Sequence, residues 1–123
     1  MMTLISEVAN TEAQKLGGKH GKGIQNAVRH FMCQAMIAAF VGRGAARAIG
    51  DAHERGGGDW GSKASKSDLY NNSIARNYGV SHQNTLLAIA RRNRHMSVHA
   101  RMRQVASYLR AIGSVKWRLG VLK

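Results

Sequence analysis

Three short strings of polar residues carry the side chains best suited to acid–base or metal chemistry. They are Asn26-Ala27-Val28-Arg29-His30, Asp51-Ala52-His53-Glu54 and Asp68-Leu69-Tyr70-Asn71-Asn72. A histidine titrates near neutral pH, and a neighbouring carboxylate can tune it as a general acid or base. The candidate catalytic residues are His30, His53, Glu54, Asp68, Asn71 and Asn72. If the reaction uses a divalent metal ion, the candidate ligands are His30, His53 and Asp68.

The two histidine strings also have a structural interpretation. On a helix, His53 lies on the same side as Ile49, so it faces inward or into a cleft, where a carboxylate partner would stabilise it. Asn26 and His30 lie four residues apart on an otherwise apolar helix, which also carries Gln34 on that face. Polar groups in such a place must find partners, so a hydrogen bond between Asn26 and His30 is the structural alternative.

The third string is harder to explain by structure alone. Asp68 can be the N-cap of a helix. Two consecutive asparagines, Asn71 and Asn72, are poor helix formers because their side chains compete for backbone hydrogen bonds. Side-chain amides that orient a carboxylate, a water molecule or a substrate oxygen would account for them.

The three strings, taken in order, resemble an uncharacterised helical domain family of bacterial and phage-borne proteins. Its pattern is N-A-x-R-H, then D-A-H-E, then D-L-Y-N-N, and the likeness covers about residues 17–79. Domains of this family sometimes stand at the C-terminus of polymorphic toxins and secreted effectors. The resemblance implies a toxin-like context but supplies no reaction, and the arginine-rich part from about residue 80 to 123 lies outside it.

The charge of the chain indicates a polyanionic partner. Lys and Arg number 19 against six Asp and Glu, so the formal net charge is +13. Nucleic acid is the first expected partner, ahead of an anionic membrane surface, and an acidic inhibitor or immunity protein would also fit. The residues expected to bind nucleic acid are Arg76, Arg91, Arg92, Arg94, Arg101 and Arg103.

Apolar periodicity predicts an all-α fold, with one domain over residues 1–123 built as a compact bundle of five or six helices. The expected helices cover about 3–16, 24–41, 45–56, 68–78, 81–93 and 97–112. Gly79 and Gly113 are expected to end two of them, and Ser81 and Ser97 to cap the starts of the next. From Val115 onward apolar and polar residues alternate, which indicates an extended C-terminal tail.

Several classes of protein are disfavoured by the sequence. Cys33 is the only cysteine, which excludes an internal disulfide framework and a zinc site made of several thiolates. The first residues have no basic stretch followed by an apolar one, so we expect no signal peptide. The longest apolar run, Phe31 to Val41, is about half the ~20 residues that a membrane span needs. We therefore expect a protein of the cytoplasm, or one delivered into a target cell.

Helical ribonucleases of the HEPN type place an Arg a few residues before a His, and two pairs here have that spacing. Arg76 precedes His82, and Arg94 precedes His99. The expected helix stop at Gly79 and the expected helix start at Ser97 disfavour both pairs, because the residues of each pair would then lie on different elements.

Three functions follow as expectations. The first is a toxin-like hydrolase that acts on nucleic acid, RNA more than DNA, through the His, Glu, Asp and Asn cluster. The second is a non-catalytic protein that binds nucleic acid, in which the same cluster only stabilises the fold. The third is an effector that acts at the cell envelope, on phospholipid or cell wall.

The charge generates a first prediction. Binding to RNA or DNA should weaken steeply as salt rises, because each neutralised phosphate releases condensed counterions. Replacing Arg91, Arg92 and Arg94 together should weaken binding without unfolding the protein, since surface changes usually cost about 0.5 kcal/mol or less. Fluorescence anisotropy across a salt series measures the affinity. An affinity that is flat from low to physiological salt would show that the basic residues do not form the binding face.

Overall fold

The computed structural model describes residues 2–17, 21–56 and 63–123, and this part of the chain contains six α-helices and no strand. The helices are α1 (Met2–Gln14), α2 (Gly21–Phe40), α3 (Arg43–Gly56), α4 (Lys63–Ser81), α5 (Gln83–Arg92) and α6 (Val98–Arg118). The predicted all-α class is confirmed. No helix among the described residues is both long enough and apolar enough to cross a lipid bilayer.

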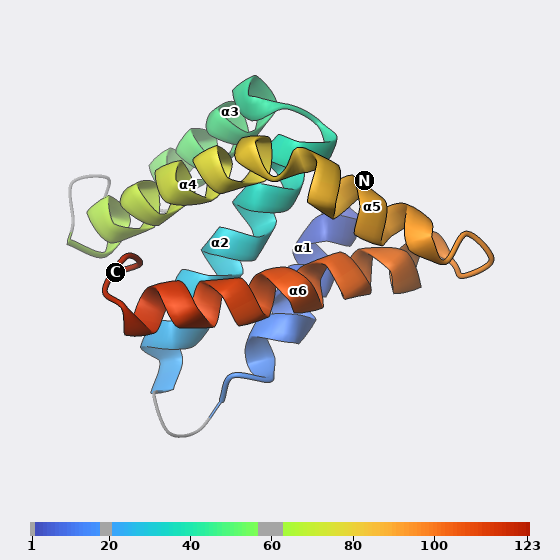
Figure 1. Cartoon of the computed structure of the whole chain (residues 1–123). Coiled ribbons are helices and arrows are strands. Elements are labelled where there is room, and N and C mark those ends of the chain that lie inside the picture. Colours follow the sequence, from blue (N-terminus) through green and yellow to red (C-terminus); the bar gives the residue numbers. More distant parts are fainter. Residues whose placement is uncertain (1, 18–20, 57–62) are drawn as a thin grey trace.

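Helix α2 is the centre of the fold, and every other helix contacts it (Figure 1). Its second half holds most of the long apolar run from Phe31 to Val41. Phe31, Met32 and Met36 are fully buried, and burial continues to Ala39. Val41 is exposed because the helix ends at Phe40, and the chain turns at Gly42, whose φ of 132° suits glycine. The central role of α2 follows from side chains that are apolar on nearly every face.

Gly79 does not end a helix, and the prediction that it does was wrong. Helix α4 continues through it to Ser81 and begins at Lys63, so it is longer at both ends than the predicted element. A methyl group at Gly79 would overlap the carbonyl oxygen of Ala35 on α2. The missing side chain therefore allows the backbones of α2 and α4 to approach closely.

Gly113 has the same role on α6, where a stop was also wrongly predicted. A Cβ atom there would lie 3.0 Å from both Phe31 and Val28 of α2. Helix α6 runs on to Arg118, because the partly buried Trp117 continues the apolar stripe at helical spacing. The tail is consequently shorter than predicted, and only residues 119–123 follow the helix.

The two predicted serine caps have different outcomes. Ser97 caps α6, and its hydroxyl accepts a hydrogen bond from the backbone N–H of Ala100 at 3.1 Å. Ser81 is instead the last residue of α4, and α5 begins after His82, which makes no side-chain cap bond. Ser81 does not begin α5 because α4 does not end at Gly79. The helix continues to Ser81, the position that was expected to begin α5.

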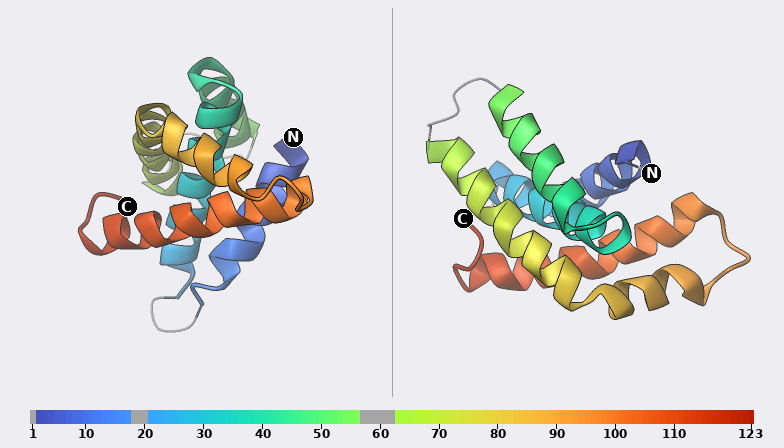
Figure 2. Two further views of the ribbon diagram at one scale, coloured as in Figure 1. Left: turned by 45° about the vertical axis from the view of Figure 1, so that its right-hand side comes forward. Right: turned by 90° about the horizontal axis from the view of Figure 1, so that it is seen from above.

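The other helices pack on different parts of α2, as the view from above shows (Figure 2). Helices α3 and α4 lie side by side as a hairpin across one part of α2, while α1 and α6 contact each other and other parts of α2. The constant spacing of the contacts between α2 and α4 shows that these two helices run in the same direction. Asn26 contacts Asp68, and Gln34 contacts Arg76, both at a separation of 42 residues.

The close approach at Gly79 generates a second prediction. Gly79→Ala should lower the free energy of unfolding by about 1–3 kcal/mol through overpacking, although Ala is the better helix former. Gly44→Ala is the matched control, because nothing lies within 4 Å of its added methyl group. The control should be neutral or stabilising by up to about 1 kcal/mol. Urea unfolding measures both, and equal effects of the two changes would contradict the packing account.

Candidate active site

His30 lies between side chains of α4 at the buried contact of α2 and α4. Its Nδ1 is 3.1 Å from Asn72 Oδ1, and its Nε2 is 3.4 Å from Asp68 Oδ2. The exposed fraction is 9% for the His30 side chain and 17% for that of Asp68. Two of the three predicted strings therefore meet, and they meet through the histidine and carboxylate that were expected to do chemistry.

Further residues extend this contact in both directions. Asn26 Nδ2 donates to Asp68 Oδ1 at 3.0 Å, and Arg29 Nη2 donates to Asn26 Oδ1 at 2.8 Å. One connected chain thus runs from Arg29 through Asn26 and Asp68 to His30. The structural alternative of an Asn26–His30 hydrogen bond takes a different form here, because both residues instead contact Asp68.

The contacts between α2 and α4 repeat at every helical turn, and we call them the polar seam. It consists of three pairs, Asn26–Asp68, His30–Asn72 and Gln34–Arg76. The third pair is a hydrogen bond of 3.3 Å from Arg76 Nη1 to Gln34 Oε1. The members on each helix are four residues apart, so they lie on one face. Helical spacing and parallel packing together produce the seam.

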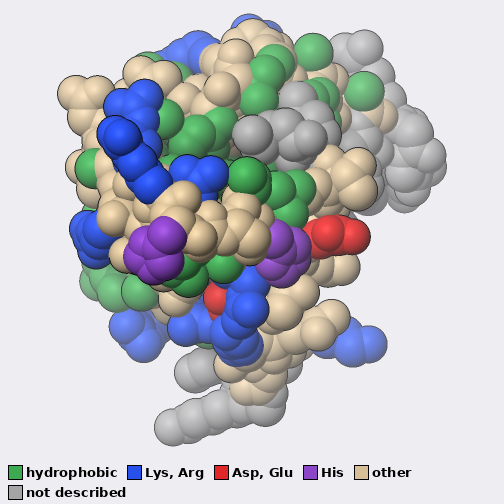
Figure 3. Space-filling view, turned by 90° about the vertical axis from the view of Figure 1, so that its right-hand side faces the viewer, with side chains coloured by type: hydrophobic (Ala, Val, Ile, Leu, Met, Phe, Trp, Pro, Cys, Tyr) green, Lys and Arg blue, Asp and Glu red, His purple; other side chains and the backbone are tan. Residues whose placement is uncertain are grey.

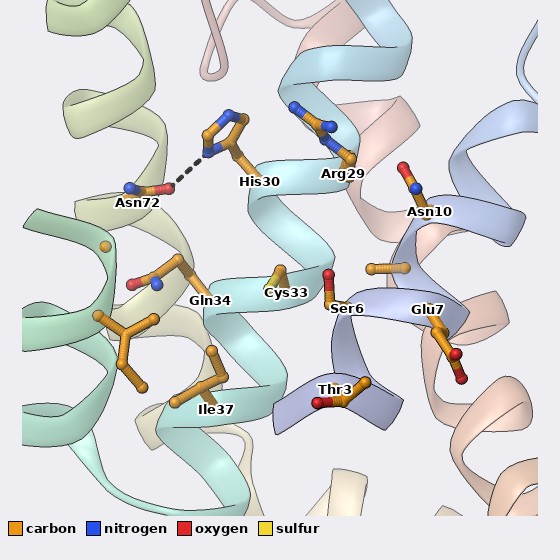
Figure 4. A pocket seen from close by; sticks show the side chains of 13 residues that line it. Thr3, Ser6, Glu7, Asn10, Arg29, His30, Cys33, Gln34, Ile37 and Asn72 are labelled. Carbon is orange, nitrogen blue, oxygen red and sulfur yellow. Dashed lines mark hydrogen bonds between the residues drawn. The ribbon is translucent and has the colours of Figure 1, made fainter. Parts of the chain in front are cut away.

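A groove opens beside the polar seam. Its volume is about 480 Å³, and Figure 4 shows side chains of α1 facing those of α2 across it. His30, Cys33 and Gln34 belong to the floor, which α2 forms. The lining residues are Thr3, Ser6, Glu7, Ala9 and Asn10 from α1, Arg29, His30, Cys33, Gln34 and Ile37 from α2, Ile49 and Gly50 from α3, and Asn72 from α4. The histidine that is held by Asn72 therefore faces a space that can hold a ligand.

Gly50 allows α3 to close one side of this groove. A Cβ atom at that position would lie 3.0 Å from Asn72 Nδ2 and 3.0 Å from Gln34 Nε2. The backbone of α3 carries His53 and Glu54 one helical turn beyond the groove-lining Ile49 and Gly50. The side chains of His53 and Glu54 lie outside the described residues, so their predicted roles stay predictions.

The two asparagines of the third string have different hydrogen-bond partners. Asn72 is part of the polar seam, whereas Asn71 binds the backbone of Lys123. Asn71 Nδ2 donates to the Lys123 carbonyl at 3.0 Å, and the Lys123 N–H donates to Asn71 Oδ1 at 2.9 Å. Consecutive residues of a helix point about 100° apart, so only one of them can face His30. Asn71, predicted as a catalytic candidate, holds the C-terminal residues here.

The arginines that were predicted to bind nucleic acid occupy two different places. Arg76 does not line the groove, but it donates a hydrogen bond to Gln34, which does. The exposed Arg91, Arg92, Arg94 and Arg103 lie in and around the α5–α6 connection, and none of them is among the residues that line the groove. Arg101 is partly buried, and its Nη1 donates to the Ala90 carbonyl at 3.3 Å, which ties α6 to α5.

On the face shown in Figure 3, the basic side chains do not form one continuous patch. On the side that holds the α5–α6 connection, Lys and Arg appear at several separate places with other side chains between them (Figure 3). Helix α6 also packs on the far side of α2 from the groove. Val28 and Phe31 meet Gly113 of α6, whereas Arg29 and Cys33 line the groove.

The pair expected of a HEPN-type site does not converge. Arg76 and His82 are not separated by a break in the helix at Gly79, so the reason for setting this pair aside was wrong. Their side chains nonetheless have different neighbours. Arg76 bonds to Gln34, while the His82 ring stacks on Tyr78 with a centroid distance of 3.9 Å.

Two titratable groups at the groove have shifted pKa values. Burial raises the pKa of the Cys33 thiol, and the nearby Arg29 offsets part of this rise. Burial lowers the pKa of the Arg76 guanidinium; Asp51 opposes this, and Arg47 and Arg43 add to it. A protonated thiol is a poor nucleophile, which disfavours Cys33 as the attacking group at neutral pH.

The described residues bring together two of the three predicted metal ligands, His30 and Asp68. Within the part of the chain that the structure describes, no group of three His, Cys, Asp or Glu side chains is arranged to hold a metal ion. The side chain of the third candidate, His53, is outside the described part of the structure.

Sequence reasoning missed the contribution of α1. Ser6, Glu7 and Asn10 line the groove opposite His30, and all three are exposed. Their spacing gives the signal that could have identified them, because Ser6 and Asn10 lie four residues apart on the polar side of an amphipathic helix. A polar face pointing to solvent and one pointing to a groove look alike in sequence.

Comparison with known proteins gives one match. The family described as "Domain of unknown function (DUF6973)" matches residues 2–105. No curated protein and no solved structure matches the chain. The matched range covers the polar seam and the whole groove, and it ends within α6.

The position of Cys33 generates a third prediction. Because burial raises its pKa, the thiolate fraction at pH 8 should be smaller in the folded protein than in the unfolded chain. Labelling by Ellman's reagent should be severalfold slower in buffer than in urea, and should accelerate as pH rises beyond the ordinary thiol range. Cys33 is the only cysteine, so the Cys33→Ser variant gives the blank. Equal rates in buffer and urea at pH 8 would contradict the assignment.

Proposed function

The chain belongs to the DUF6973 family, whose function is unknown, and we propose from its own residues that the groove is the active site of a hydrolase acting on nucleic acid, with RNA ahead of DNA. The observation that carries the proposal is the placement of His30 between Asn72 and Asp68 in the lining of the groove.

The geometry around His30 suits proton transfer. If Nδ1–H donates to Asn72 Oδ1, the other ring nitrogen, Nε2, faces Asp68 Oδ2 with one proton to share between them. When that proton is absent, Nε2 can accept one from an attacking water or hydroxyl group, and the imidazolium so formed, beside the Asp68 carboxylate, can return it to the leaving oxygen. Asn26, which donates to the other oxygen of Asp68, holds the carboxylate in place.

The charge distribution supports a nucleic-acid substrate. No Asp or Glu follows Asp68 in the sequence, so the whole of α5 and α6 carries positive charge only. In this proposal the arginines of the α5–α6 connection attract the polyanion over a distance, and the groove performs the reaction. Figure 3 supports this division, because the Lys and Arg side chains on that face are spread out.

His53 and Glu54 are included in the proposal because of the sequence pattern and the family resemblance. They follow the groove-lining Ile49 and Gly50 on α3, which favours a role as a second acid–base group or as a ligand of a divalent metal ion. If a metal ion takes part, His30, His53 and Asp68 are its proposed ligands, and it would polarise the phosphate. The toxin-like context remains part of the proposal, and an acidic immunity protein would match the charge.

A non-catalytic role in binding nucleic acid is the second candidate, and one observation favours it. Every residue of the polar seam has a hydrogen-bond partner or close polar contact, as expected for a network that only stabilises the fold. The assay that separates the two candidates incubates the protein, with and without EDTA, with tRNA, total RNA, plasmid and anionic liposomes. Release of lipid products would instead favour action at the cell envelope.

A fourth prediction tests the acid–base pair. Asp68→Asn keeps the shape of the side chain but removes the carboxylate, and it should lower the cleavage rate ~10²–10⁴-fold. The matched control is His82→Gln, which alters an exposed histidine that contacts Tyr78 away from the groove. The control should cleave at the rate of the parent. His53→Ala and Glu54→Gln should also abolish activity while leaving the thermal midpoint within a few degrees of the parent.

Two outcomes would contradict the hydrolase. Either the parent cleaves none of the substrates, or Asp68→Asn retains full activity while melting far below the parent. The first outcome would put the non-catalytic candidate in its place. The second outcome would assign the polar seam a structural role, and the active site would then lie elsewhere.

A further inference from the structure

Three arginines gather on the outer side of the α3–α4 hairpin, next to the groove. Arg43 and Arg47 lie four residues apart on one face of α3, and Arg76 lies on the adjacent α4. Arg43 and Arg47 are near enough to Arg76 for their positive charges to act on its guanidinium. We call these three residues the hairpin arginines.

The contacts of the hairpin arginines use few of their donors. Arg43 Nη1 donates to the Asn77 side-chain oxygen at 2.6 Å, and Arg76 Nη1 donates to Gln34 Oε1 at 3.3 Å. Both acceptors are neutral amides. A guanidinium carries five N–H donors, so Arg43 and Arg76 each keep donors that these amide contacts do not occupy.

Charge compensation within the hairpin is incomplete. Among the carboxylates whose side chains the structure describes, Asp51 is the one that acts on the group, and its Oδ2 lies 3.9 Å from Arg47 Nε. The side chain of Arg47 is 74% exposed, so this long ion pair is weak and its guanidinium is free to reorient. Three cations therefore face one carboxylate, and an anion would relieve the repulsion among them.

The position of the hairpin arginines links them to the groove. Gln34, which accepts from Arg76, is also a residue of the groove floor. Asn72, which contacts His30, is one helical turn before Arg76 on α4. A strand bound at the hairpin arginines would thus reach the groove directly. The arginines of the α5–α6 connection lack this link, because α6 packs on the opposite side of α2.

We propose that Arg43, Arg47 and Arg76 form an oxyanion site that binds a backbone phosphate of a nucleic-acid strand. Fork-shaped guanidinium groups suit the geometry of phosphate oxygens, and a cluster of them holds one phosphate more tightly than separate surface charges do. The choice of nucleic acid over a free ion rests on the proposed function, whereas the oxyanion site itself does not. Sequence reasoning had assigned only Arg76 of these three to nucleic-acid binding.

The test compares two triple variants that remove the same charge. One is Arg43→Gln, Arg47→Gln and Arg76→Gln in the hairpin, and the other is Arg91→Gln, Arg92→Gln and Arg94→Gln in the α5–α6 connection. Affinity is measured by anisotropy with a labelled RNA tetranucleotide, too short to cover the whole basic surface. Thermal melting shows that each variant is folded, and Arg76→Lys keeps the charge but loses the forked donor geometry.

The proposal predicts an unequal loss. The hairpin variant should bind the tetranucleotide at least about tenfold more weakly than the parent, as expected when charged hydrogen bonds are lost. The variant of the α5–α6 connection should lose less, through the reduction of net charge alone. Arg76→Lys should fall between the parent and the hairpin variant. Equal losses in the two triple variants, or a larger loss in the α5–α6 connection, would overturn the proposal.

A direct measurement covers the case in which the hairpin variant does not fold. In the parent, the Arg Nε–H resonances are followed by NMR during titration with the tetranucleotide and, separately, with inorganic phosphate. Resonances of Arg43, Arg47 and Arg76 should shift at lower tetranucleotide concentrations than those of Arg91 and Arg92. If inorganic phosphate shifts them at equal or lower concentrations, the site binds a free ion and the nucleic-acid assignment is wrong. These binding measurements are independent of cleavage, so they can succeed where the hydrolase fails.

Discussion

The polar seam between α2 and α4 is the constraint on which the rest of the structure depends. Its three pairs, Asn26–Asp68, His30–Asn72 and Gln34–Arg76, share one separation of 42 residues. A shift of either helix by one turn would leave buried polar groups without partners, at a cost of about 1–3 kcal/mol for each. Asn72 and Gln34 are nearly fully buried, so this cost applies to them in particular. The seam thereby fixes the register of α4 on α2.

The seam is possible because two glycines keep the neighbouring backbones close. Gly79 brings α4 against Ala35 of α2, and Gly50 brings α3 over Asn72 and Gln34. A larger residue at either position would separate the helices that supply the polar groups. The groove is a consequence of the same arrangement, since α1 and α3 flank the face of α2 that carries His30, Cys33 and Gln34. The packing of the core therefore also determines the geometry of the candidate site.

The sequence predicted the helical class and the apolar helix α2, and each prediction rested on a pattern within one segment. His30 and Asp68 were both candidates, but the contact between them was not predicted. The residues Asn26, His30 and Gln34 stood out because they interrupt an apolar helix at four-residue spacing. The predictions that failed concerned residues whose roles depend on contacts between segments. Gly79 looks like a stop in isolation, and its role becomes visible only against the Ala35 carbonyl. The choice between Asn71 and Asn72 likewise required the orientation of α4, which no local pattern supplies.

The surface expected to bind nucleic acid was also assigned from patterns within single segments. Counting arginines favoured the α5–α6 connection, where they are dense, whereas the hairpin arginines, which reach the groove through Gln34, come from α3 and α4. Arg43 and Arg47 were not selected because they lie outside the arginine-rich second half of the chain. Their significance comes from the hairpin that places them against Arg76. Charge density in the sequence thus indicated the kind of partner, and the fold indicates where it would meet the groove.

The central claim is that His30 shares a proton with Asp68, rather than being a histidine whose hydrogen bonds are fixed. The most direct measurement is the ¹⁵N spectrum of the His30 imidazole in labelled protein, assigned by comparison with His30→Gln. The account predicts a protonated Nδ1 that donates to Asn72 Oδ1, whether the shared proton rests on Nε2 or on Asp68. An unprotonated Nδ1 with a proton fixed on Nε2 would contradict it. The Asn72 amide would then be the donor, and His30 would be a satisfied structural residue.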